Sequence, residues 1–115
     1  MSTRIYHNPK CSTSRKVLQA LRDAGAEPEI VEYLKTPPTK AELKDLLKRM
    51  GKRPRELLRK KEALYKELGL DSEKKSDEAI IDAMLANPIL IERPIVVTKK
   101  GVRLGRPPES VNEIL

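Results

Sequence analysis

The only cysteine of the chain, Cys11, lies where an expected strand gives way to an expected helix. Residues 4–7 alternate apolar and polar side chains as a short strand does, and Asn8-Pro9 ends that strand because proline cannot donate a ladder hydrogen bond. Apolar residues then recur at helical spacing, with Ser12 or Thr13 as the expected N-cap. The sequence therefore predicts Cys11 at a helix N-terminus, where unpaired N–H groups favour a thiolate.

The order of the remaining elements predicts an α/β fold. A strand, a helix and a second strand open the chain, which favours parallel pairing with a right-handed crossover. Helices fill the middle of the chain, and two antiparallel strands and a terminal helix close it. This order (βαβ, then ββα) predicts a thioredoxin-like fold with a helical insertion between its halves. The expected ranges are 4–7, 13–25 and 29–34, then helices within about 39–88, and finally 94–98, 102–105 and a helix from 107.

The length and the cysteine count limit the class of protein. A chain of 115 residues is expected to form one domain over 1–115. The sequence shows no apolar run typical of a signal peptide or a membrane span, and one cysteine makes no internal disulfide. We therefore expect a cytoplasmic protein with no membrane partner. A redox reaction at this thiol would need its second sulfur from another molecule.

The chain carries a net charge of +7, which favours an anionic partner. That partner is an oxyanion, an acidic protein or a nucleic acid. The cations concentrate only between Lys48 and Lys61, and such a run is usually a solvated helix face. Nucleic-acid binding is disfavoured because the aromatic residues that would stack on bases are limited to three tyrosines.

The residues around Cys11 favour a reactive thiol over a buried structural one. Its charged and hydroxyl neighbours are not typical of a core, where most free cysteines lie. Ser12, Thr13 and Ser14, with the backbone N–H groups of the helix start, are candidates for an oxyanion cradle, or they only cap the helix. Arg15 either clamps the same anion with its planar guanidinium or lies on the surface.

His7 and three arginines are further candidates. A protonated His7 would favour the Cys11 thiolate, whereas a neutral ring would only form a hydrogen bond. One cysteine and one histidine cannot fill a zinc site, so no metal is expected. Arg59, Arg93 and Arg106 each lie at the boundary of an expected element. Each is either a surface cation or a ligand of the anion. A cis Arg93-Pro94 bond is compatible with a thioredoxin-like turn.

Five motifs together resemble the glutaredoxin-dependent arsenate reductase family. The resemblance covers essentially the whole chain, and the ending of the sequence looks more like the short bacterial members than the longer plasmid-borne enzymes. The motifs are His7-Asn8-Pro9-x-Cys11-x-Thr13-Ser14-Arg15, Leu57-Leu58-Arg59-Lys60, Asn87-Pro88-Ile89-Leu90, Arg93-Pro94-Ile95-Val96-Val97 and Gly105-Arg106-Pro107.

The resemblance implies a reaction and its partners. Cys11 would attack arsenate, His7 would help to ionise it, and Arg59, Arg93 and Arg106 would surround the oxyanion. Glutathione, as a co-substrate, would then attack the adduct. Glutaredoxin would reduce the resulting mixed disulfide, and arsenite would be released. No tightly bound cofactor is implied.

Two related functions remain open from the sequence. The first is an Spx-like regulatory protein that binds RNA polymerase, although Ser14 occupies the place of the second cysteine in that switch. The second is a glutathione-dependent thiol reductase of unknown substrate. The phosphatase-like arsenate reductases are excluded, because Val17 stands where their Cys-x5-Arg loop needs an arginine.

Overall fold

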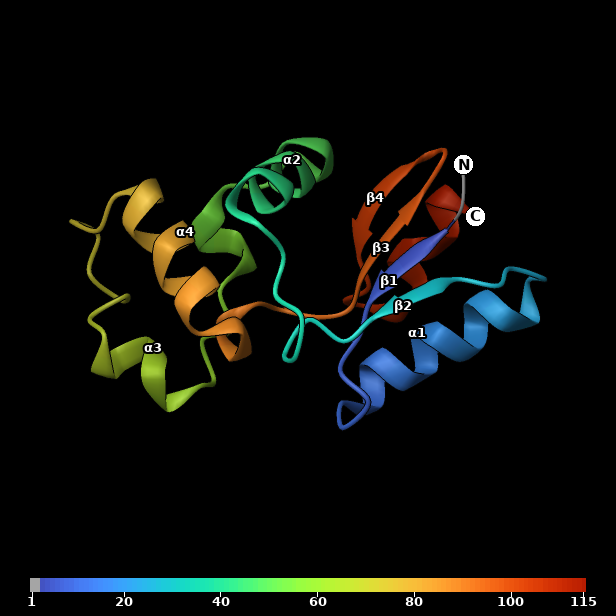
Figure 1. Cartoon of the computed structure of the whole chain (residues 1–115), viewed down its shortest axis with the longest axis horizontal. Coiled ribbons are helices and arrows are strands. Elements are labelled where there is room, and N and C mark those ends of the chain that lie inside the picture. Colours follow the sequence, from blue (N-terminus) through green and yellow to red (C-terminus); the bar gives the residue numbers. More distant parts are fainter. Residues whose placement is uncertain (1–2) are drawn as a thin grey trace. The chain divides into compact units, whose positions relative to one another are not determined.

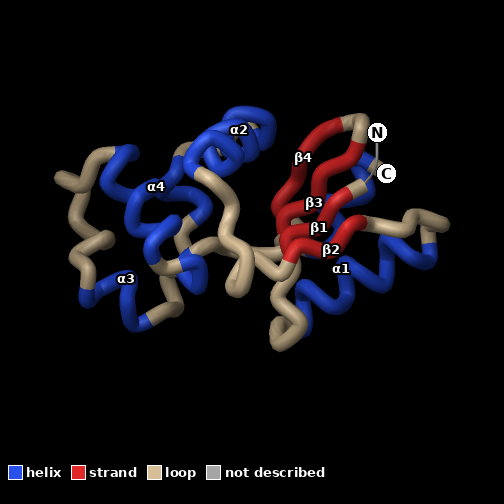
Figure 2. Tube along the Cα trace, in the orientation of Figure 1, coloured by secondary structure: helices blue, strands red, loops and turns tan. Residues whose placement is uncertain are grey.

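The computed structural model describes residues 3–115, which divide into two compact units (Figure 1). Unit 1 combines residues 3–36 with residues 93–115, and unit 2 spans Pro37–Glu92. The strands all belong to unit 1, whereas both units contain helices (Figure 2). The insertion predicted at about 39–88 therefore lies within unit 2. The single-domain organisation stays a prediction.

Unit 1 is built on a four-stranded mixed sheet in the order β2-β1-β3-β4. β1 is parallel to β2 and β3 is antiparallel to β4, as the element order predicted. The antiparallel pairing of β1 with β3 joins the two pairs into one sheet. The second strand is shorter than the predicted 29–34, because a turn begins at Glu32, whose carbonyl accepts from the N–H of Lys35. The strands are β1 Arg4–Tyr6, β2 Glu29–Val31, β3 Ile95–Thr98 and β4 Gly101–Leu104.

One face of this sheet is covered by two helices, α1 (Ser12–Asp23) and the 3-10 helix η3 (Pro108–Ile114). The predicted terminal helix is thus a 3-10 helix rather than an α-helix. It begins with an i to i+3 bond from the N–H of Ser110 to the carbonyl of Pro107, the pattern of short 3-10 turns. The core between sheet and helices contains Ile5, Val17, Leu18, Leu21, Val96, Val111 and Ile114.

Gly105 allows β4 to end against α1 and the start of β3. A Cβ atom at Gly105 would lie 2.9 Å from both Pro94 Cγ and Val17 Cγ2. We expect Gly105→Ala to lower the free energy of unfolding by about 1–3 kcal/mol, the usual cost of overpacking. Urea unfolding monitored by circular dichroism measures this change.

The control for this prediction is Gly25→Ala. Gly25 has a φ of +85° but no heavy atom within 4 Å of an added Cβ, so this variant reports conformational strain without overpacking. Wild-type stability of Gly105→Ala would contradict the close approach.

Unit 2 consists of short helices, and local caps mark the ends of two of them. Thr39 and Glu42 form a capping box at the start of α2, Gly51 ends it at a φ of +67°, and the Ser76 hydroxyl caps α4. Lys40 and Lys44 on α2 bind Glu78 on α4 and hold the pKa of this exposed carboxyl down to about 2. The helices are α2 Lys40–Met50, η1 Pro54–Leu57, α3 Ala63–Glu67, α4 Asp77–Ala86 and η2 Pro88–Leu90.

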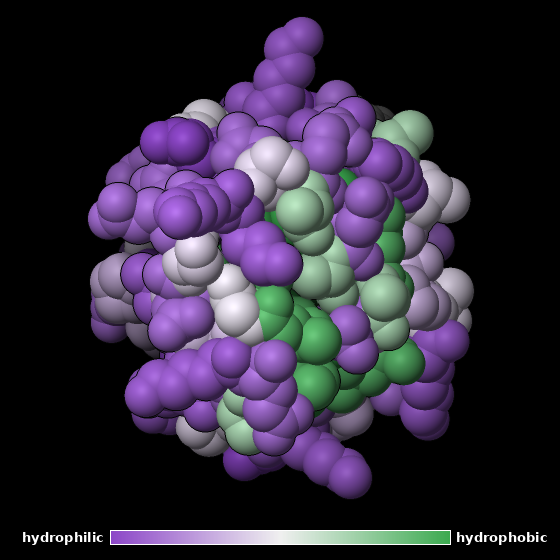
Figure 3. All heavy atoms as spheres, turned by 90° about the vertical axis from the view of Figure 1, so that its left-hand side faces the viewer, coloured by the Kyte–Doolittle hydropathy of each residue, from purple (hydrophilic) through white to green (hydrophobic). Residues whose placement is uncertain are grey.

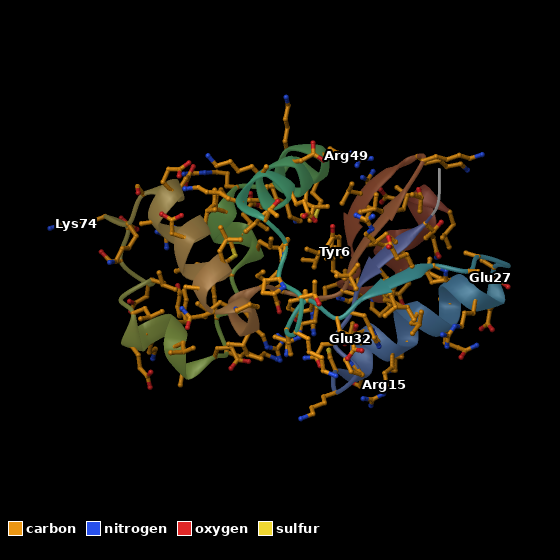
Figure 4. The ribbon with its side chains drawn as sticks, in the orientation of Figure 1. Tyr6, Arg15, Glu27, Glu32, Arg49 and Lys74 are labelled. Carbon is orange, nitrogen blue, oxygen red and sulfur yellow. The ribbon has the colours of Figure 1, made fainter. Side chains whose placement is uncertain are left out.

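The surface of unit 2 that carries α3 and α4 is not uniformly polar. Apolar side chains gather in the middle of this face, surrounded by hydrophilic ones (Figure 3). Leu68, just after α3, has 39% of its surface exposed. Lys74 extends from the loop before α4 (Figure 4).

The helices of residues 3–115 are short. The longest, α1, has 12 residues, and none combines the length and apolar character of a membrane-crossing segment.

Candidate active site

Cys11 itself occupies the N-cap position of α1. Its backbone is extended, its N–H donates to the carbonyl of Asn8 at 3.0 Å, and its carbonyl accepts from the N–H of Arg15 at 3.0 Å. No side chain caps the helix, so the expectation that Ser12 or Thr13 does so was wrong. The N-cap is Cys11, one residue before Ser12, so the sulfur lies at the N-terminal end of α1.

Ser14 connects the cysteine loop to the end of β1. Its side chain is fully buried, and its Oγ accepts from the N–H of Asn8 at 3.1 Å and lies 2.6 Å from Nδ1 of His7. Its own backbone N–H donates to the sulfur of Cys11. The hydroxyl of Ser14 therefore holds the loop, while its N–H is the group that faces the thiol.

His7 is buried, with 5% of its surface exposed. Burial is the main cause that lowers the pKa of His7. Arg22 and Arg15 lower it further, whereas Glu32 raises it. The neutral ring is thus favoured at pH 7, and of the two roles left open by the sequence the hydrogen-bonding one matches the contact with Ser14. The groups that favour the Cys11 thiolate come from elsewhere.

Two arginines from the far end of the chain lie at the thiol. Arg106 donates from Nη2 to Cys11 Sγ at 3.3 Å and from Nε to the carbonyl of Arg93 at 2.8 Å. The side chain of Arg93, which is buried, also forms a hydrogen bond with Cys11. These residues meet because β1 and β4 end beside the first residue of β3, so the segments that flank all three strands lie at the same end of the sheet.

Both arginines precede cis peptide bonds. The Arg93-Pro94 bond is cis, as the thioredoxin-like turn suggested. The Arg106-Pro107 bond is also cis, which the sequence did not indicate.

The surroundings of Cys11 lower its thiol pKa. Burial alone would raise this pKa, but the N–H of Ser14, the side chain of Arg93 and the positive charge of Arg106 outweigh that effect. The predicted reactive thiol thus lies among the donors that a thiolate requires.

We expect the alkylation rate of Cys11 to rise with pH to a midpoint below about 8.5, the value of an ordinary cysteine. The shift is downward because the thiolate, not the thiol, is stabilised in the fold. Stopped-flow reaction with iodoacetamide between pH 5 and 10 measures the midpoint. The protein unfolded in urea serves as the reference, and equal midpoints for the two states would contradict the electrostatic account.

Three other residues predicted around the anion belong to the first turn of α1. Arg15, at the N-terminal end of α1 (Figure 4), donates from Nη1 to the carbonyl of Pro9 at 2.9 Å and braces the loop. Ser12 is exposed and Thr13 is half-buried. Among residues 3–115, no three His, Cys, Asp or Glu side chains are grouped as a metal site requires.

Arg59 belongs to unit 2, where it is largely buried against two carboxylates. Its Nη1 donates to Glu92 at 3.0 Å and its Nε to Glu62 at 3.2 Å. Arg59 is therefore not a free surface cation, and its role as an oxyanion ligand stays a prediction.

Asn8 is the loop residue that the sequence reasoning missed. Its Oδ1 accepts from the N–H of Lys10 at 3.0 Å, and its carbonyl accepts from the N–H of Cys11. The Asn-Pro pair was interpreted only as a strand breaker. The preference of asparagine for turns in which it binds its own backbone two residues on was the signal for this role.

Comparison with known proteins shows the family of this chain. A model of the ArsC family matches residues 6–114. The chain belongs to the ArsC family. The family sequence resemblance and the thioredoxin-like fold predicted from the element order are both confirmed.

Individual members of the ArsC family are similar over nearly the whole chain. An Escherichia coli K12 protein, YfgD, is 56% identical over 97% of this chain and 95% of its own length. An arsenate reductase of the same strain is 56% identical over 96% of this chain and 79% of its own length. The solved arsenate reductase from Vibrio cholerae superposes with a TM-score of 0.95 at 51% identity, over 100% of this chain and 98% of that one.

Proposed function

We propose that this ArsC-family protein reduces arsenate to arsenite, with the Cys11 thiolate as the nucleophile. The observation that carries the proposal is the contact of Arg106 and Arg93 with the sulfur of Cys11 at a helix N-terminus. Relatives named arsenate reductases, 50–56% identical to this chain, support the choice of substrate.

The first step forms a bond between sulfur and arsenic. The thiolate attacks the arsenic of arsenate, one arsenate oxygen leaves as water after protonation, and arsenic keeps its oxidation state. Guanidinium groups beside the sulfur suit a tetrahedral oxyanion, because they offer charge-assisted donors to the oxygens that gain charge in the transition state. We assign this role to Arg93 and Arg106. The backbone N–H groups of Ser12, Thr13 and Ser14 add donors on the helix side.

The second stage supplies two electrons from outside the chain. Overall, arsenate and two thiols give arsenite, one disulfide and water. Because Cys11 is the only cysteine, the electrons must come from other thiols. We assign them to glutathione, which attacks the arsenic adduct, and to glutaredoxin, which reduces the glutathione-linked product. These partners imply a reducing compartment and are in line with the predicted cytoplasmic location.

The remaining predicted residues keep supporting roles in this proposal. Arg15 supports the loop from which Cys11 attacks, through its hydrogen bond to the carbonyl of Pro9. His7 acts on Cys11 through Ser14 rather than by its charge, since its neutral form is favoured.

The proposal is tested by arsenate-dependent oxidation of NADPH in the presence of glutathione, glutathione reductase and glutaredoxin. We expect turnover only when arsenate, glutathione and glutaredoxin are all present. Turnover of a disulfide substrate without arsenate would instead indicate the glutathione-dependent thiol reductase. A folded protein that alkylates rapidly at Cys11 but oxidises no NADPH with arsenate would refute the assigned substrate.

A further inference from the structure

Asn8 is a polar residue that is almost fully buried just after β1, with 4% of its surface exposed. Three of its groups form hydrogen bonds. Its N–H donates to Oγ of Ser14 at 3.1 Å, its carbonyl accepts from the N–H of Cys11 at 3.0 Å, and its Oδ1 accepts from the N–H of Lys10 at 3.0 Å. Asn8 therefore closes two turns at once, an outer one with its carbonyl and an inner one with its side chain.

The turn of residues 8–11 decides where the sulfur of Cys11 lies. The backbone of Cys11 is extended, at a φ of −93° and a ψ of 122°, and its N–H is held by the carbonyl of Asn8. The backbone conformation of a residue sets the direction in which its side chain leaves the chain. In this conformation the sulfur meets three donors: the N–H of Ser14, the side chain of Arg93 and Nη2 of Arg106 at 3.3 Å. A different turn would point the sulfur away from them.

The side chain of Asn8 restrains a turn whose tip is exposed. Pro9 and Lys10 both lie at the surface, so water can replace Oδ1 as the partner of the Lys10 N–H. Loss of the Oδ1 bond would therefore cost the fold little. Its main effect falls on the mobility of the turn, since this bond is the one hydrogen bond that the Asn8 side chain forms among residues 3–115.

We propose that Asn8 is a positioning residue for the reaction of Cys11: its Oδ1 holds the turn in the conformation that keeps the sulfur at its three donors. Asn8 does not touch the substrate in this role. A nucleophile held in its reacting geometry loses less conformational freedom in the transition state than one on a mobile turn. The effect on arsenate turnover rests on the proposed function, whereas the effect on the thiol does not.

Asn8→Ala and Asn8→Ser separate the hydrogen bond of Oδ1 from the volume of the side chain. Both variants leave nearly the same space, but the serine hydroxyl still accepts from the N–H two residues on. We expect Asn8→Ala to lower kcat for arsenate about three- to tenfold, the usual range for one hydrogen bond, with KM nearly unchanged. Asn8→Ser should stay within about twofold of wild type.

The pH profile of alkylation is a second readout, which a purely structural role would not move. In Asn8→Ala the midpoint should rise towards that of the unfolded protein, because the sulfur spends less time at its donors and the thiolate is less stabilised. In Asn8→Ser the midpoint should rise less. Urea unfolding monitored by circular dichroism shows that each variant is folded.

Asn87→Ala is the matched control for this measurement. Asn87 also precedes a proline, and its Nδ2 donates to the carbonyl of Ala83 at 3.2 Å. It belongs to unit 2, so the same substitution there removes a local hydrogen bond without changing the turn of residues 8–11. The alkylation midpoint of Asn87→Ala should equal that of wild type.

The possible outcomes separate the two proposals. A wild-type midpoint and a wild-type kcat in Asn8→Ala would overturn the positioning role. Equal losses in Asn8→Ala and Asn8→Ser would overturn it as well, because the acceptor oxygen would then not matter. A loss in Asn8→Ala that Asn8→Ser restores, with the midpoints shifted in the same order, supports it. If the wild type turns over no arsenate, the proposed function fails, and the alkylation midpoints alone then decide the positioning role.

Discussion

Cys11→Ser is expected to abolish arsenate turnover, with a fall in kcat of about 10³-fold or more. A serine hydroxyl does not ionise near neutral pH, and neither Arg106 nor the N–H of Ser14 lowers its pKa far enough to change that. The bond between the nucleophile and arsenic then does not form. The coupled assay with glutathione and glutaredoxin measures the loss at saturating arsenate.

The same variant should leave the fold intact, since Cys11 is only partly buried and serine is of similar size. Its circular dichroism and urea midpoint should match those of wild type. Gln19→Ala, an exposed change on the same helix, is the activity control. Residual turnover above one-tenth of wild type in Cys11→Ser would show that Cys11 is not the nucleophile.

Arg106→Ala is expected to lower kcat/KM for arsenate by about 10²- to 10³-fold, the usual cost of removing a donor from a developing oxyanion. It should also raise the pKa of Cys11, because it removes a positive charge and a hydrogen bond from the sulfur. The coupled assay and the pH profile of alkylation measure these two effects independently.

Arg106→Lys should recover little of this loss, although it restores the charge. The guanidinium binds two partners at once, the Arg93 carbonyl through Nε and the Cys11 sulfur through Nη2, and a single ammonium does not reproduce that fork. Arg103→Ala on β4 is a matched control, since Arg103 binds Glu113 on the surface. Full activity of Arg106→Lys would mean that charge alone is required.

The sequence was most informative where a few neighbouring residues decide the structure. The capping box of Thr39 and Glu42 was readable because cap and partner are three residues apart. The place of Cys11 at a helix start followed from Asn8-Pro9 and the apolar spacing behind it. The parallel pairing of the first two strands followed from the helix that connects them, and the antiparallel pairing of the last two followed from the short turn between them.

The sequence was least informative where distant residues compete for the same group. The hydroxyl of Ser14 was expected to cap or to bind an anion, but the end of β1 brings His7 and Asn8 to it first. Arg59 was considered alone, because nothing local shows that Glu92 lies opposite it across a backbone bridge. Such partners become visible only when the whole chain is folded.

The contact between Arg106 and Cys11 spans 95 positions of the chain. During synthesis the cysteine leaves the ribosome long before this arginine does. The thiol of a growing chain therefore lacks the positive charge that Arg106 supplies in the folded protein. The full lowering of the thiol pKa is therefore reached only once the last strand is in place.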